Sequence, residues 1–449
     1  MNKIGYLTFG RDEISYGLAL CMSNLSRDSL FRITPKTILL VDWVLFSVFW
    51  WEHIYLLANF LRAAGISRMN HPRPKIIIGG FSTFNPVPLS RYADFVICGD
   101  GEEALPAVLR GEEHPGIYYS PGSCATWQNI RALKAFCHET NGIARIELAR
   151  GCKYRCRFCA VAHLKPYRET EIGGIEDLLR KSRSKRVSLF APEPTLHSAD
   201  EQITKICHRL GKIRVDSDVR LDHLSKRSDS VPRVGIEGLS EKLRKSVNKP
   251  CSNCQIIEAT RQAITEGRKG FFVYLILDLP GESENDWKEF RELLREIGKL
   301  PGAENFLLKP SPSVFMPTPH TPMEFDAIHW ETDYTSKWSS FFGRGNDRQW
   351  DVMIAERSRI FKPAMRILCM LATRAGAEFW EIEEELTREK IISVSGGRVH
   401  CKSERRLLST LKNYGGVERY CGAYTGTPPW KSLQVGKFDS EIFREGGEK

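Results

Sequence analysis

The sequence predicts an α/β protein with two successive parallel βα regions and a mainly helical C-terminal extension. Short apolar runs alternate with helical stretches over the first ~115 residues, and the same rhythm returns from residue 143 to about residue 325. Beyond residue 326 the pattern becomes mainly helical. Because 449 residues exceed one typical core, we expect domains at 1–115 and 143–325, a connection at 116–142 and an extension at 326–449.

Composition excludes few function classes. A hydrophobic content of 42% with 27% charged residues is typical of a soluble globular protein. The net charge of +10 fits an anionic partner, including nucleic acid, or simply a basic surface. The chain begins with a strand-like segment and no secretory signal, so we expect a cytoplasmic protein. In that compartment the 13 cysteines indicate metal binding or redox chemistry, not disulfides.

Residues 37–61 are apolar enough to be tested as a membrane span. Asp42, Glu52 and His53 interrupt the segment, and no uninterrupted run reaches the length that a bilayer needs. We therefore predict a buried strand at Trp43–Val48 and a helix at Trp51–Ala64, with no membrane association.

The first region has four predicted strands, at Ile4–Phe9, Trp43–Val48, Lys75–Ile78 and Phe95–Cys98. Glycine-rich turns follow the last two. Glycine allows a ligand to approach the backbone at the carboxyl edge of a parallel sheet, where open α/β folds bind ligands. These glycines are equally compatible with ordinary turns.

A loop-rich stretch at about 113–142 precedes the second region, which carries six predicted strands. They are Arg145–Leu148, Arg186–Phe190, Ile213–Asp216, Arg233–Ile236, Phe271–Leu277 and Phe306–Lys309. The helices predicted between them are Ile175–Lys181, Asp200–Leu210, Ser240–Val247 and Ile256–Glu266. Six βα units in succession predict a partial parallel barrel with its site at the carboxyl ends of the strands.

The extension carries aromatic residues, basic runs and two predicted helices, Ala355–Arg374 and Phe379–Glu389. Basic residues interleaved with aromatic ones can contact nucleic acid. They serve a peptide or protein surface equally well, so the extension is predicted to bind a substrate of undetermined class.

Three cysteines, Cys152, Cys156 and Cys159, follow the first predicted barrel strand with C-x3-C-x2-C spacing. On a loop this spacing lets three thiolates converge on one metal centre, and soft thiolates suit iron–sulfur or zinc. Three ligands leave one metal position open, whereas a structural zinc site requires a fourth ligand, for which His163 is available. Three intervening basic residues are expected to lower the thiolate pKa values: Lys153, Arg155 and Arg157.

The triplet, with Phe158 before its last cysteine, resembles the motif of the radical S-adenosylmethionine (radical SAM) superfamily. Further segments resemble the family in the same order. Pro232–Arg244 resembles "GxExGSxxLR", Leu279–Asp286 resembles "LPGE(T/S)xxD" and Met316–Pro322 resembles "PxPxTP". Four ordered signatures over about 180 residues favour this family over a zinc site.

The resemblance implies a partial (β/α)6 radical SAM barrel, a 4Fe-4S cluster on the three cysteines and S-adenosylmethionine at the open iron. A radical generated from S-adenosylmethionine would then abstract a substrate hydrogen, with flavodoxin or ferredoxin as electron donor. The residues it places around S-adenosylmethionine are Phe158, Glu193, Arg220, Glu237, Ser240 and Gly281. For Glu193 and Arg220 a surface ion pair is an equal alternative.

The N-terminal region resembles the Rossmann-like cobalamin-binding domain of one radical SAM subclass, through Asp42–Val48, Ile76–Ser82 and Ala93–Glu103. The residues that the resemblance places at the corrin and its nucleotide tail are Ser47, Gly79, Gly80, Gly99, Gly101 and Glu102. The first strand is followed by Gly10–Glu13 and not by a D-x-H-x-x-G motif, so a histidine ligand to cobalt is unsupported. The alternative is a domain that keeps the fold without binding cobalamin.

With cobalamin, the resemblance implies a C-methyltransferase acting on an unactivated carbon, because such a carbon has no lone pair for polar methylation. Likeness to archaeal members favours a protein or peptide side chain, including methyl-coenzyme M reductase. Alternatives are small-molecule biosynthesis and a non-catalytic cobalamin or iron–sulfur sensor. A methylthiotransferase acting on tRNA or a ribosomal protein is disfavoured, because the first 115 residues contain only Cys21 and Cys98.

Cys251 and Cys254 form a second C-x2-C pair before a predicted helix. They are compatible with an auxiliary cluster, with Cys401 or Cys421 as further ligands, or with a redox pair. Their position before a helix is also compatible with two free thiols, which we favour.

Overall fold

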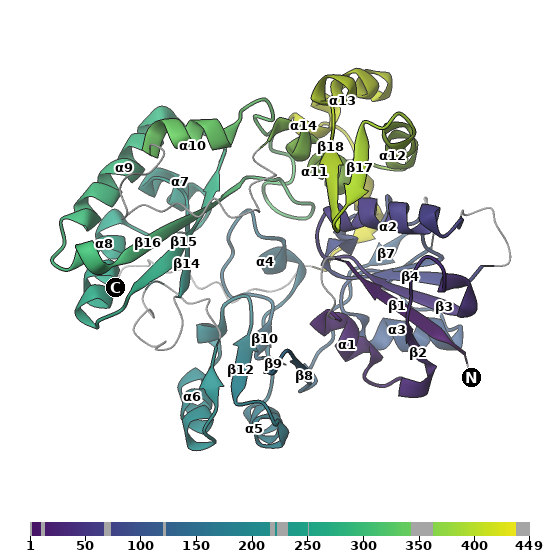
Figure 1. Cartoon of the computed structure of the whole chain (residues 1–449), viewed down its shortest axis with the longest axis horizontal. Coiled ribbons are helices and arrows are strands. Elements are labelled where there is room, and N and C mark those ends of the chain that lie inside the picture. Colours follow the sequence, from purple (N-terminus) through teal and green to yellow (C-terminus); the bar gives the residue numbers. More distant parts are fainter. Residues whose placement is uncertain are drawn as a thin grey trace. The chain divides into compact units, whose positions relative to one another are not determined.

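The computed structural model describes residues 2–9, 14–66, 73–119, 123–215, 221, 232–249, 251–342 and 362–436. They divide into two compact units (Figure 1). Unit 1 takes the described residues of Met1–Arg131, Thr318–His320 and Ala364–Asp439, and unit 2 those of Ala132–Pro317 and Thr321–Pro363. The region beyond residue 326 is therefore shared between the two units.

Unit 1 is built on a six-stranded sheet of order β2-β1-β3-β4-β5-β6. Its strands are β1 (Ile4–Thr8), β2 (Leu30–Arg32), β3 (Trp43–Ser47), β4 (Lys75–Gly79), β5 (Phe95–Ile97) and β6 (Ile117–Tyr118). All neighbours are parallel except β5 and β6. The four predicted strands agree with β1, β3, β4 and β5 to within a residue at each end, whereas the short β2 and β6 were not predicted.

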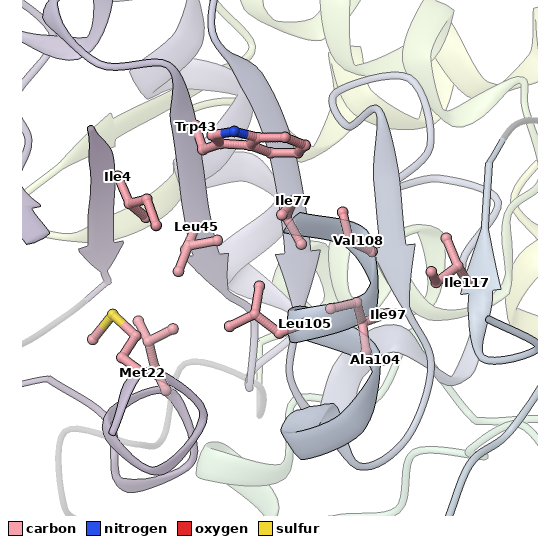
Figure 2. Packing of buried hydrophobic residues seen from close by; sticks show 11 residues of the cluster. Ile4, Met22, Trp43, Leu45, Ile77, Ile97, Ala104, Leu105, Val108 and Ile117 are labelled. Carbon is pink, nitrogen blue, oxygen red and sulfur yellow. The ribbon is translucent and has the colours of Figure 1, made fainter. Parts of the chain in front are cut away.

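Successive residues of β3 point to opposite faces of this sheet, and both faces are buried. Helices α1 (Tyr16–Met22) and α3 (Gly101–Arg110) cover one face. Figure 2 shows this packing, in which strand residues meet helix residues: Ile4, Trp43, Leu45, Ile77, Ile97, Met22, Ala104, Leu105 and Val108. Helix α2 (Glu52–Ala63) lies on the other face, where Phe60 contacts Phe46 with ring centroids 5.7 Å apart.

The C-terminal part of unit 1 is mainly helical, as predicted. Its elements are α11 (Pro363–Arg374), α12 (Phe379–Arg388), β17 (Ile392–Ser395), β18 (Arg398–Cys401), α13 (Glu404–Leu411), α14 (Glu418–Cys421) and β19 (Leu433–Gln434). The hairpin of β17 and β18 was not predicted. This part packs on α2, because the Tyr55 hydroxyl donates to the Leu368 carbonyl at 2.8 Å and Arg62 pairs with Glu383 at 2.7 Å.

Unit 2 contains the six strands predicted for the barrel, in two parallel sheets (Figure 1). The first has β9 (Ile143–Glu147), β12 (Arg186–Phe190) and β13 (Ile213–Arg214), with β8 (Cys137–Thr140) antiparallel at its edge. The second has β14 (Arg233–Glu237), β15 (Gly270–Leu277) and β16 (Leu307–Val314). The predicted parallel α/β class is confirmed, and within the described residues β13 and β14 are not paired.

The helices of unit 2 follow its strands in the predicted order. They are α4 (Ala160–Leu164), α5 (Ile172–Lys181), α6 (Asp200–Arg209), α7 (Glu241–Ser246), α8 (Asn253–Thr265), α9 (Glu284–Gly298) and α10 (Tyr334–Phe342). Helices α5 and α6 bury Ile175, Leu179 and Ile203 against β9 and β12. Helix α10 packs on α9 through Trp338 and Trp287, whose ring centroids are 5.9 Å apart.

Residues 113–142, predicted as a loop-rich connection, also contain β6, β7 (Ala125–Thr126) and β8. β6 and β7 have two residues each, which is too short to show a period in the sequence. They form only because β5 pairs with β6 and β19 pairs with β7. Short 3-10 helices complete the description: η1 (Arg27–Ser29), η2 (Ile38–Leu40), η3 (Phe81–Phe84), η4 (Pro194–Leu196), η6 (Ala303–Asn305), η9 (Lys412–Tyr414) and η10 (Pro429–Ser432).

The apolar stretch 37–61 divides into η2, β3 and α2, as the interrupting charges predict. Across the described residues, no helix combines the length and apolar character needed to cross a membrane. Arg220, Gly10–Glu13 and part of the predicted helix Ala355–Arg374 lie outside the described residues.

Candidate functional site

The cysteine triplet lies on a loop closed by the antiparallel pair β10 (Ala149–Arg150) and β11 (Arg168–Glu169). Gly151 begins the loop with φ +81°, and a Cβ there would overlap the Lys165 and Pro166 carbonyls, so only glycine fits. Cys152 is half-buried and Cys156 is buried. The Cys159 N–H donates to the Cys156 carbonyl at 3.1 Å, which fixes the turn between these two thiols.

Burial dominates the electrostatics of these thiols. It raises the pKa of Cys156 to about 12 and also raises the pKa of Cys159. The N–H groups of Ala162 and Val161, at the start of α4, and the Lys249 ammonium act in the opposite direction on Cys159. Buried soft donors of this kind suit a metal that supplies positive charge, so the donor set fits an iron–sulfur cluster. Within the described residues, no three His, Cys, Asp or Glu side chains already form a metal-binding group.

The basic residues of the loop bond to backbone carbonyls. Lys153 donates to the Leu196 carbonyl at 3.3 Å, Arg155 to the Ala162 carbonyl at 2.5 Å and Arg157 to the Ser246 carbonyl at 3.1 Å. These side chains brace the loop, and the cation that lowers the pKa values of Cys156 and Cys159 is Lys249. The sequence prediction considered only neighbouring residues and therefore omitted Lys249.

His163, the fourth ligand that a zinc site requires, contacts the loop backbone. Its Nε2 lies 3.1 Å from the Cys156 carbonyl oxygen, and burial lowers its pKa. A ring nitrogen facing a carbonyl oxygen must carry the proton, so this nitrogen is not a metal donor in this arrangement.

Glu237 and Glu193 lie near the same lysine. Glu237 ends β14 at a register shift with φ +68°, and its Oε1 is 3.2 Å from Lys249 Nζ. Glu193 follows β12 and helps raise the pKa of Lys249. A Cβ at Gly235 would overlap Glu237 Oε1 and lie 2.8 Å from Lys249 Nζ, so glycine leaves room for the ion pair. Lys249 was not identified from the sequence, because no family signature includes it.

The other residues predicted around S-adenosylmethionine differ in their burial and in their contacts. Ser240 is fully buried, caps α7 by accepting from the Leu243 N–H and donates to Asp286, so its hydroxyl serves the fold. Gly281 is an exposed turn residue with φ +82° whose carbonyl accepts from Lys242 at 3.1 Å. Phe158 is half-buried between Cys156 and Cys159 in sequence, and Arg220 lies outside the described residues.

A buried polar network holds the turn that follows β15. Asp278 has φ +65°, and its Oδ1 accepts from the Tyr334 hydroxyl at 2.7 Å and contacts His329 Nδ1 at 2.6 Å. Glu282 accepts from the Asp278 N–H and from Trp287 Nε1, both at 2.8 Å. Burial raises the pKa of Glu282 to about 7. The "LPGE" resemblance marked this turn, but its partners 50 residues away carry no local signal.

The second cysteine pair lies at the start of α8. Cys251 is half-buried, Cys254 is exposed, and Ser252 between them forms a capping box with Gln255. The Cys251 carbonyl accepts from the buried Arg244 at 2.6 Å. This arrangement accounts for the segment as a helix cap, so the auxiliary-cluster alternative gains no support.

At the carboxyl edge of unit 1, the residues predicted for cobalamin flank neighbouring strands. Ser47 ends β3, pairs in register with Gly79 of β4 and accepts from the Ser15 hydroxyl at 3.2 Å. Gly80 has φ +114°, and a Cβ there would overlap the Val48 carbonyl. The protein's own backbone therefore requires glycine at this position.

The second glycine turn follows β5. Gly99 has φ +101°, and a Cβ there would overlap the Gln128 carbonyl. Gly101 begins α3, where a Cβ would lie 2.9 Å from Cys21 Sγ, and Glu102 lies in the first turn of that helix. Close packing within unit 1 thus accounts for Gly99 and Gly101, as it does for Gly80.

Aromatic side chains at this edge were not singled out from the sequence. Phe49 and Trp50 follow β3 and are 51% and 58% exposed. Phe49 lies near Phe81, which follows β4, with ring centroids 6.1 Å apart. His53 accepts from the Phe49 N–H at 3.1 Å through Nδ1, and burial lowers its pKa to about 4. Exposed apolar rings beside a parallel sheet edge suit a flat macrocycle, so these residues fit a corrin.

Two family models match this chain. The model described as "Radical SAM superfamily" matches residues 146–294, which include the cysteine loop and β9 to α9. The chain carries a radical SAM domain. The match confirms the predicted class, and with it the 4Fe-4S cluster and S-adenosylmethionine that define radical SAM enzymes. A second model, "Radical SAM proteins, N-terminal", matches residues 29–114 in unit 1.

Individual proteins similar to this chain are distant. An uncharacterized protein of Methanocaldococcus jannaschii, MJ0966, is 27% identical over 208 residues, which are 43% of this chain and only 44% of that protein. The radical S-adenosylmethionine methyltransferase TsrM from Kitasatospora setae has a similar fold, with a TM-score of 0.54 and 15% identity over 72% of this chain and 77% of TsrM. The cobalamin-dependent S-adenosylmethionine radical enzyme OxsB has a TM-score of 0.48 and 14% identity over 92% of this chain and 66% of OxsB.

Proposed function

We propose that this radical SAM enzyme is a cobalamin-dependent methyltransferase that methylates an unactivated carbon. The observation that carries the proposal is the pairing of two sites in one chain. Unit 2 presents a cysteine loop next to Glu237 and Lys249, and unit 1 presents a glycine- and aromatic-lined carboxyl edge on a parallel sheet. TsrM, whose fold is similar, is a radical S-adenosylmethionine methyltransferase solved with cobalamin and a [4Fe-4S] cluster.

In this proposal Cys152, Cys156 and Cys159 hold the cluster, and Glu193 and Glu237 border S-adenosylmethionine. When bound, the cluster and S-adenosylmethionine would supply a radical able to abstract hydrogen, and cobalamin would carry a methyl group. The protein's residues bind and orient these groups. Gly151 sets the start of the cysteine loop, and Arg155 and Arg157 brace it through backbone carbonyls.

For cobalamin, the proposal assigns Ser47, Gly79, Phe49 and Trp50 to the corrin-facing edge of unit 1. His53 is not a cobalt ligand in this arrangement. Its Nδ1 accepts the Phe49 N–H, so the proton of the neutral ring resides on Nε2 and neither lone pair is free.

The substrate is proposed to be a protein or peptide side chain. The basic, aromatic-rich C-terminal region supports a macromolecular surface, and no RNA-binding module is recognisable in the sequence. In an archaeal host, methyl-coenzyme M reductase is the first target to examine.

Cofactor binding is tested by anaerobic purification with added hydroxocobalamin, followed by iron counting, visible spectra and detection of 5′-deoxyadenosine after reduction with dithionite. We expect about four iron atoms per chain, lost on Cys152→Ala, Cys156→Ala or Cys159→Ala. Iron and turnover that survive all three substitutions would refute the cluster assignment. A loaded cluster that gives no 5′-deoxyadenosine with any reductant would favour the sensor alternative.

The cobalamin edge is tested separately by Trp50→Ala. Its control is Leu40→Ala, which removes another side chain, 67% exposed, from the segment that enters the opposite end of β3. We expect Trp50→Ala to lower retained cobalamin at least severalfold with iron unchanged, and Leu40→Ala to change neither. Equal retention in the two variants would count against the proposed edge.

The substrate class is tested by intact-mass comparison of proteins from cells with and without the gene. A protein that loses the mass of one methylene group in the deletion strain supports the proposal. If every protein keeps its mass while a small metabolite loses a methyl group, the enzyme belongs to small-molecule biosynthesis instead.

A further inference from the structure

Residues 246–249, which are the last residue of α7 and the three that follow it, are tied directly to the cysteine loop. The Arg157 N–H donates to the Val247 carbonyl at 3.0 Å, and the Arg157 guanidinium donates to the Ser246 carbonyl at 3.1 Å. The Asn248 amide donates to the Arg155 carbonyl at 3.0 Å. Asn248 itself has φ +58°, a conformation that asparagine tolerates better than most residues. These bonds hold the segment against residues 155–157 on both sides of Cys156.

The segment ends at Lys249, whose position is fixed from two directions. Its backbone N–H donates to the Arg244 carbonyl at 2.9 Å, and Arg244 is itself fully buried. Its Nζ lies 3.2 Å from Glu237 Oε1, and the side chain is 34% exposed. Charge interactions with Cys156 and Glu193 act on the same ammonium group. One lysine therefore pairs with the carboxylate that ends β14 and directly follows the segment bonded to the cysteine loop.

We propose that Lys249 is a positioning residue that holds Glu237 and provides the local positive charge beside the cysteine-bound cluster, raising the cluster's affinity for an electron. The inference rests on the proposed assignment of the cluster to Cys152, Cys156 and Cys159. The reduction potential of an iron–sulfur cluster depends on nearby charge and solvent exposure, and a cation stabilises the reduced, more negative state. The loop's own basic side chains donate to backbone carbonyls, whereas Lys249 pairs with Glu237.

The strain at Glu237 supports the same role. A glutamate with φ +68° at the end of a strand persists only where its surroundings hold it, and its carboxylate forms an ion pair with Lys249. Gly235 leaves the space that this pair occupies. Loss of the lysine charge should therefore affect both the cluster and the placement of the carboxylate.

The test is potentiometric titration of the reconstituted cluster, followed by electron paramagnetic resonance, on the full chain without S-adenosylmethionine. We expect Lys249→Gln to retain iron but to bind the electron at least tenfold more weakly, about 59 mV for a one-electron couple. Lys249→Arg keeps the charge and should stay within threefold of the wild type. Lys245→Gln removes an equal charge from an exposed lysine on α7 and should leave the potential unchanged.

Gly235→Ala provides an independent variant, because it displaces the Glu237–Lys249 pair and alters neither residue. We expect it to weaken electron binding in the same direction, and it replaces Lys249→Gln if that variant does not fold. If iron-loaded Lys249→Gln has the reduction potential of the wild type, this inference alone is overturned. If Lys249→Gln does not fold, an unchanged potential in Gly235→Ala overturns it instead. A shift of equal size in Lys245→Gln would overturn it too, because position would then not matter. A wild-type chain without a reducible cluster would overturn both this inference and the proposed function.

Discussion

Glu282 gives the stability of unit 2 a predicted pH dependence. Its side chain is 5% exposed, and it accepts from the Asp278 N–H and Trp287 Nε1. Burial raises its pKa from 4.5 to about 7, against the opposing effects of Trp287 and Lys337. A carboxyl group with a raised pKa binds its proton more tightly in the folded state, so its contribution is complete below pH 4.5 and is lost as pH rises through 7.

The magnitude follows from the two pKa values. One pKa unit corresponds to 1.36 kcal/mol, so the group should contribute about 2.5 kcal/mol more stability at pH 5 than at pH 8. The side chain of the Glu282→Gln variant cannot ionise. However, its NH2 group would face one of the two N–H donors that Glu282 accepts from, and this mismatch should lower stability at pH 5 by about 1 kcal/mol or more. The wild type should thus be more stable than the variant at pH 5, and this difference should shrink or reverse by pH 8.

Urea titrations at pH 5, 6.5 and 8 measure this difference. The other titrating groups are present in both proteins, so their effects cancel in the comparison. Glu284→Gln, an exposed glutamate on the first turn of α9, is the matched control and should run parallel to the wild type. A constant difference between the wild type and Glu282→Gln across the pH range would refute the reasoning.

Three further sites, each with its own substitution, test the packing by urea titration. Gly80→Ala should destabilise unit 1 by about 1–3 kcal/mol, because φ is +114° and the added Cβ would overlap the Val48 carbonyl. Its control is Gly17→Ala on α1, where no atom lies within 4 Å of the added Cβ. This control should raise stability by up to about 1 kcal/mol. Equal effects would contradict the backbone argument. Trp287→Ala, which removes a fully buried ring, should destabilise unit 2 by about 3–5 kcal/mol, and a loss below about 1 kcal/mol would show that the ring is not packed as described. Arg62→Met should cost about 3 kcal/mol, because Glu383 is left 3% exposed without its cation, and adding Glu383→Met should recover most of the loss. A double variant as unstable as the single one would argue against an unpaired buried charge as the cause.

Strands and motifs with strong local signals were predictable from the sequence. Lys75–Ile78 contains three consecutive β-branched isoleucines, is bounded by a proline and glycines, and forms β4 with one residue more. The spacing of Cys152, Cys156 and Cys159 indicated one metal centre, because three thiols on one short loop have few other arrangements. The α/β class and the radical SAM resemblance followed from such local patterns.

The surroundings of these residues were decided only by the tertiary structure. Asn248 donates to the Arg155 carbonyl across 93 residues, and Tyr334 donates to Asp278 across 56 residues. The segment from residue 364 joins unit 1 through contacts such as Tyr55 to Leu368, 313 residues apart. Periodicity and spacing report only the local conformation of a segment. Charge, burial and hydrogen bonding at a site depend on which distant segments meet there, and that choice is made by packing.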